Sequence, residues 1–114
     1  MKKFDRVKQY LDDAVDGDAI GAHGNFWRTL SLPDFKTFVV PIRGGVPLLV
    51  VGNGDNSNLI KALKGVFPFG MDLGVPGATF NRMPDHAFGY DPMPDDRIGY
   101  IKDWIDGGCL DQDE

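Results

Sequence analysis

The two ends of the chain carry amphipathic helical patterns, and this pairing constrains the fold more than any other feature. The first pattern runs from Phe4 to Val15, with apolar residues at helical spacing, and Gly17 ends it. The last helix is expected to begin near Pro94, where two aspartates suit the positive helix N-terminus, and to stop at Gly107. Its apolar face consists of Ile98, Ile101, Trp104 and Ile105.

The long middle of the chain is rich in glycine and proline and predicts short helices joined by loops. Pro33 followed by Asp34 indicates the opening of a short helix, and the turn over 52–58 caps another, from Leu59 to Lys64. We read 46–51 as an extended buried loop because Pro47 interrupts its strand pattern. Residues 66–92 form an irregular excursion, so the sequence predicts a mostly α-helical fold.

Length and charge exclude several classes of protein. A chain of 114 residues is expected to form one domain, 1–114, with a frayed acidic tail at 110–114. A net charge of −5 without a basic stripe argues against nucleic-acid binding. No apolar run is long enough for a membrane span, so no membrane partner is expected. The charged N-terminus and the lone Cys109 favour a cytoplasmic address, or a periplasmic one if an export signal was trimmed.

The order of the motifs points to a family. A His-Gly follows the first helix, then LSLPDF, then GGVPLLVVGNGDNSNLIKALKG, then RMP at 82–84, and finally a helix containing Trp-Ile that ends in Gly-Gly. This order resembles the small mono-haem c-type cytochromes, especially the planctomycete-type cytochrome c modules. The resemblance covers roughly residues 4–110. It implies a cytochrome c-like fold in which the terminal helices cross and pack, through Phe4, Val7 and Leu11 with Ile98, Ile101 and Ile105.

The resemblance also assigns a haem site, with one departure from the family. His23 matches the proximal iron ligand and Met83 the distal methionine, although Met93 belongs to a second Met-Pro pair. Ala19 and Ala22 stand where the family has the two cysteines that attach haem through thioether bonds. Covalent attachment is therefore excluded. We expect aromatic side chains to refill the haem pocket: Phe26, Trp27, Phe67, Phe69, Phe80 and Phe88.

Three functions remain open at this point. The favoured hypothesis is a haem-free, non-enzymatic module without a cofactor or metal, which binds a protein partner such as a redox enzyme. The first alternative is an electron carrier that binds haem non-covalently through His23 and Met83. The second is a small copper protein using the same pair, because thioether and imidazole suit copper. His86 is expected to be a solvated loop histidine, and Cys109 an unreactive thiol.

Overall fold

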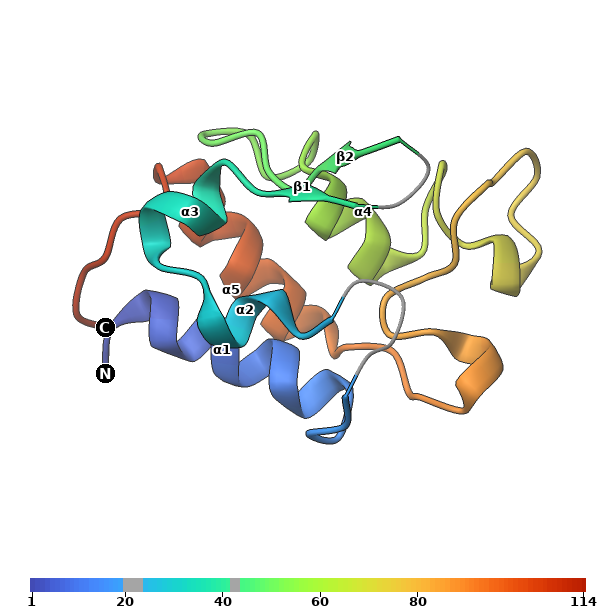
Figure 1. Cartoon of the computed structure of the whole chain (residues 1–114), viewed down its shortest axis with the longest axis horizontal. Coiled ribbons are helices and arrows are strands. Elements are labelled where there is room, and N and C mark those ends of the chain that lie inside the picture. The colour runs from blue at the N-terminus through green and yellow to red at the C-terminus, as the bar shows by residue number, and fades with distance from the viewer. Residues whose placement is uncertain (20–23, 42–43) are drawn as a thin grey trace.

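The computed structural model describes residues 1–19, 24–41 and 44–114 (Figure 1). The described part contains five α-helices and one short antiparallel two-stranded ribbon, joined by long segments without regular structure. The α-helices are α1 (Lys3–Ala14), α2 (Phe26–Thr29), α3 (Leu32–Lys36), α4 (Asn58–Lys64) and α5 (Asp95–Asp106). The remaining elements are strands β1 (Val39–Val40) and β2 (Val46–Pro47) and the 3-10 turns η1 (Met71–Leu73) and η2 (His86–Phe88). None of the helices in these ranges is long and apolar enough to cross a membrane.

The terminal helices α1 and α5 pack against one another, as expected (Figure 1). Phe4 of α1 stacks on Trp104 of α5, with ring centroids 5.8 Å apart and an interplanar angle of 11°. Further along the pair, the rings of Tyr10 and Tyr100 meet edge to face at 5.5 Å. Such aromatic pairs add stability beyond the area that they bury. The predicted apolar faces of both helices are buried.

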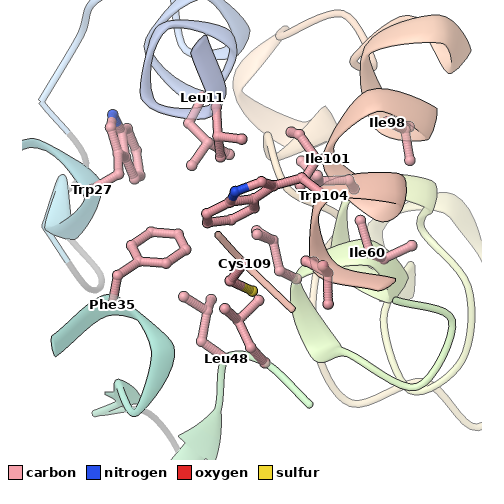
Figure 2. Packing of buried hydrophobic residues seen from close by; sticks show 14 of the residues in the cluster. Leu11, Trp27, Phe35, Leu48, Ile60, Ile98, Ile101, Trp104 and Cys109 are labelled. Carbon is pink, nitrogen blue, oxygen red and sulfur yellow. The ribbon is translucent and has the colours of Figure 1, made fainter. Parts of the chain in front are cut away.

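The short helices α2 and α3 complete the core around this helix pair. Trp27 of α2 and Phe35 of α3 are fully buried, and the ring centroid of Phe35 lies 6.1 Å from that of Trp104 (Figure 2). Leu48, from the segment after β2, and Cys109, from the segment after α5, belong to the same core cluster (Figure 2). The apolar faces of the terminal helices therefore meet a layer of side chains supplied by the loops, which explains how a loop-rich middle builds a core.

The middle elements differ from the sequence expectations in three details. The sequence did not predict the four-residue helix α2. The segment 46–51 was expected to be an extended buried loop, but its first two residues pair with Val39 and Val40, and only Leu48 and Leu49 are buried. Ser57 precedes α4 without capping it, because its hydroxyl instead donates to the carbonyls of Val50 and Asn53. The helix that begins beside Pro33 is confirmed, with Ser31 accepting a bond from Asp34 N–H.

The acidic C-terminal residues, which we expected to fray, are exposed and form hydrogen bonds with the N-terminal segment. The amide of Lys3 donates to the carbonyl of Gln112 at 2.8 Å, and the amide of Glu114 donates to the carbonyl of Met1 at 3.1 Å. The Arg6 guanidinium holds both carboxylate oxygens of Glu114, at 2.8 and 3.1 Å. Backbone pairing and a two-point ion pair fix this segment beside α1. Sequence position alone did not reveal either.

Candidate functional site

A cavity of about 550 Å³ lies between the ribbon, α4 and the irregular excursion over 66–92. Its volume falls within the range of small-molecule sites, about 300–1,000 Å³. Most of its wall is apolar: Val15, Ala19, Phe26, Val40, Val46, Pro47, Leu48, Leu59, Ala62, Phe69, Met71, Phe80, Met83, Pro84 and Phe88. The polar residues on the wall are Asn58, Thr79, Asn81, Arg82, Asp85 and Tyr90.

The phenylalanines border this cavity rather than fill it, so the prediction of a refilled pocket was wrong. Phe69 and Phe80 form an aromatic pair on the wall, with centroids 5.3 Å apart. Phe67 and Phe88 are 61% and 80% exposed and turn toward solvent. Trp27 lies in the helical core instead. Of the six aromatic residues, Phe26, Phe69, Phe80 and Phe88 line the cavity, and Phe67 and Trp27 do not.

The structure distinguishes the two candidate methionines. Met83 is partly buried and lies on the cavity wall. Ala19, from the segment after α1, also lines the cavity. Met93 is 3% exposed and packs in the helical core, near Ile98. Of the two Met-Pro methionines, Met83 therefore lines the cavity, whereas Met93 is not among the residues that line it. The other predicted site residues, Ala22 and His23, lie outside the described residues.

A single carboxylate positions the segment that carries Met83. Asp72 accepts hydrogen bonds from the backbone amides of Arg82 and His86, each at 2.7 Å. Burial raises the pKa of Asp72, but these bonds outweigh it and hold the pKa below its ordinary value. The amide of Met83 also donates to the carbonyl of Ala62 in α4, at 2.9 Å. The backbone of Met83 is thus held by its own bond to α4 and by the bonds of its neighbours Arg82 and His86 to Asp72.

Arg82 is the one charged residue that is buried in the described part of the chain, at 6% exposure. Its Nε donates to the carbonyl of Pro84 at 2.9 Å, and its Nη2 donates to the carbonyl of Tyr90 at 2.7 Å. These bonds fold the segment 82–90 around the guanidinium. Placing a charge at an apolar cavity is costly unless hydrogen bonds and a counter-charge compensate.

Helix α2, whose Phe26 lines the cavity, is attached to α1 through a second carboxylate, that of Asp12. Asp12 accepts hydrogen bonds from the Trp27 indole and from Nε of Arg28, the latter at 2.8 Å. Burial raises the pKa of Asp12, while the bonds from Arg28 and Trp27 lower it, and the net result lies below the ordinary value. Asp18 then accepts a bond from the hydroxyl of Tyr90. The two sides of the cavity are joined by this contact.

The remaining candidates have structural roles. His86 is exposed, as expected, and its backbone amide binds Asp72. Cys109 is completely buried, and burial raises the pKa of its thiol to about 11, in keeping with an unreactive thiol. Within the described ranges, no three His, Cys, Asp or Glu side chains gather in a way that could hold a metal ion.

Sequence reasoning missed Arg82 and Asp72, which shape the cavity. The arginine directly precedes the Met-Pro motif, and a charged residue inside an apolar motif was the only available signal. Nothing in the sequence connects Asp72 with a backbone that lies 10 residues further on. Comparisons of the chain with protein-family models, with curated proteins and with solved structures found no match.

Proposed function

We propose that this chain is a non-enzymatic, cytochrome c-like module that binds haem non-covalently in its cavity. The single observation that carries the proposal is the apolar cavity of about 550 Å³ with Met83 on its wall. Its volume and apolar lining suit a porphyrin, and the Phe69–Phe80 pair offers ring faces for it to pack on. Bound haem would supply a one-electron redox centre.

The residues that would hold haem are Met83 and His23. A thioether and an imidazole form the axial pair of many electron-transfer haems. The methyl group of Ala19 on the cavity wall cannot form a thioether bond, so the haem would be held by ligation and packing alone.

The titratable groups on the cavity wall support a binding role rather than catalysis. Arg82 donates to backbone carbonyls, Tyr90 donates to Asp18, and Asp85 accepts from the amide of Asn81. Each of these groups makes at least one hydrogen bond within the protein. A general acid or base would need one of them directed at a substrate.

Titration of the purified protein with ferric haem tests this function. We expect one equivalent to bind with a Soret band distinct from that of free haem. Met83→Leu should change the spectrum, because leucine keeps the volume and removes the sulfur. Met93→Leu is the matched control, since Met93 packs in the core away from the cavity. His23→Ala should also alter the spectrum.

Two outcomes would contradict the proposal. If the folded wild-type protein bound no haem at stoichiometric concentrations, the function would be wrong. If haem bound but Met83→Leu and Met93→Leu left the spectrum equally unchanged, the assignment of Met83 as a ligand would be wrong. A parallel titration with copper ions examines the same pair of residues for a metal without porphyrin.

A second function, binding of a protein partner such as a redox enzyme, is favoured by exposed apolar side chains on the excursion. Phe67, Met71 and Phe88 are 61%, 48% and 80% exposed. Exposed apolar groups of this size often mark interaction sites. The test is co-purification from the source cells with the wild-type chain and with a Phe67→Ser/Phe88→Ser double variant. A redox enzyme that the wild type retains and the variant loses would support it, and equal retention would contradict it.

A further inference from the structure

The side chains that line the cavity restrict the chemical class of a possible ligand more than the cavity volume does. Arg82 is the sole cationic side chain among the described residues that line the cavity. Its guanidinium makes hydrogen bonds through Nε and Nη2, and no described residue accepts a bond from Nη1. Every buried side-chain nitrogen and oxygen in the described ranges has a partner, so Nη1 must reach accessible space. Because Arg82 lines the cavity and is only 6% exposed overall, we assign this accessible surface of Nη1 to the cavity.

The charge of Arg82 has no close counter-ion in the described ranges. No carboxylate there lies within 4.0 Å of the guanidinium, whereas the surface arginines Arg6, Arg28 and Arg97 each form an ion pair. The nearby Asp72 uses both of its oxygens to accept backbone amides. Asp85, also on the wall, accepts a bond from Asn81. The buried cation is therefore compensated by carbonyl dipoles and by the Coulombic attraction of Asp72, without a direct ion pair to any described residue, which leaves it able to bind a further anion.

We infer that the cavity is built for an apolar ligand that carries a carboxylate, and that Arg82 binds this carboxylate. The planar guanidinium presents paired donors that match a carboxylate, and such charge-assisted bonds are among the strongest in proteins. Apolar side chains would bury the body of the ligand. The inference rests on the proposed binding function, but it does not require iron. Porphyrin acids and long-chain fatty acids share this chemistry.

The test compares acids with their neutral esters. Dissociation constants are measured for protoporphyrin IX and its dimethyl ester by fluorescence anisotropy, and for oleic acid and methyl oleate by calorimetry. The wild-type protein should bind at least one acid about tenfold or more tightly than its ester, the effect of one charge-assisted contact. Arg82→Gln should lower the affinity for the acid by a similar factor and leave the ester unchanged. Arg97→Gln, on the outer face of the helix pair, is the matched control.

Each outcome separates this inference from the haem proposal. Porphyrin acid and ester that bind equally well would overturn the role of Arg82 while leaving haem binding intact. Discrimination in the oleate pair, with no binding of protoporphyrin IX or of ferric haem, would support the inference and contradict the haem proposal. If neither these probes nor ferric haem binds the folded protein, both are overturned. Where Arg82→Gln does not fold by circular dichroism, the acid-to-ester ratio of the wild type and of Arg82→Lys decides.

Discussion

The hydroxyl of Tyr90 donates a hydrogen bond of 2.9 Å to a carboxylate oxygen of Asp18, across a sequence separation of 72 residues. This bond raises the pKa of Tyr90 above its ordinary value, because the phenolate form would lose it and face a negative charge. Asp18 itself receives a further contact, since Asn25 donates to its backbone carbonyl. The exposed edge of the cavity is thus closed by one side chain from each side.

Removing that hydroxyl should loosen the edge without unfolding the domain. For Tyr90→Phe we expect little change in the melting temperature and a roughly two- to tenfold faster dissociation of bound haem, the effect of one hydrogen bond. Stopped-flow transfer of haem to an excess acceptor protein measures this rate. Tyr100→Phe is the control, because it loses a bond to Glu114 away from the cavity. Equal rates for both variants would contradict the role of Tyr90.

Asp72 should make the stability of the fold depend on pH in the acid range. Because its pKa in the folded state is lowered, its stabilisation is complete above its ordinary pKa and is lost as the pH falls through the lowered value. Asp72→Asn should cost about 1.5–3 kcal/mol at pH 7, as for bonds to a charged group. The difference from wild type should shrink on acidification. Urea unfolding between pH 2 and 7 measures both, with the exposed Asp91→Asn as control.

The carboxyl group of Glu114, which pairs with Arg6, should titrate far below the ordinary glutamate range. Bonds from Arg6 and Tyr100 lower the pKa of Glu114 to about 2. Its contribution is therefore present above the ordinary glutamate pKa and is lost as the pH falls toward about 2. NMR titration of the Glu114 side-chain carboxyl carbon should show the low midpoint, and Arg6→Gln should move it upward. A midpoint unchanged by Arg6→Gln would show that the pair does not persist in solution.

Gly70 and Gly89 show two different reasons why a position requires glycine: a left-handed backbone at both, and in addition a lack of space for a Cβ at Gly70. Both have a positive φ, 89° and 83°, but a Cβ on Gly70 would lie 2.4 Å from the carbonyl oxygen of Gly65, while one on Gly89 would meet nothing within 4 Å. Gly89→Ala should cost about 1–2 kcal/mol for the left-handed backbone alone. Gly70→Ala should add a further 1–3 kcal/mol, roughly, for the overlap. Urea unfolding of both variants checks the difference, and equal costs would contradict it.

The helical part of the fold could be predicted because its signals are local. The periodicity around Leu11 and Ile101 located both terminal helices and their buried faces, and Pro33 followed by Asp34 located the start of α3. These features depend on neighbours within a turn or two of helix. The prediction failed for α2, whose four residues are too few to show a period.

The cavity could not be predicted in the same way, because it depends on contacts between distant segments. Whether Phe88 fills a pocket or points to solvent is decided by where Asp72 and Tyr90 anchor its backbone, and neither anchor has a local signature. The choice between Met83 and Met93 had the same origin. Both stand before a proline, and only the packing of the excursion on α4 separates them.

The positions of the two tryptophans decide which structural changes their fluorescence can report: changes in the helical core, but not changes in the cavity wall. Trp27 and Trp104 are both buried in the helical core, and neither belongs to the residues that line the cavity. Their emission therefore follows the melting of the core and is insensitive to rearrangement of the excursion. A colourless ligand should enter without changing that emission, whereas a porphyrin should quench it by energy transfer across the molecule.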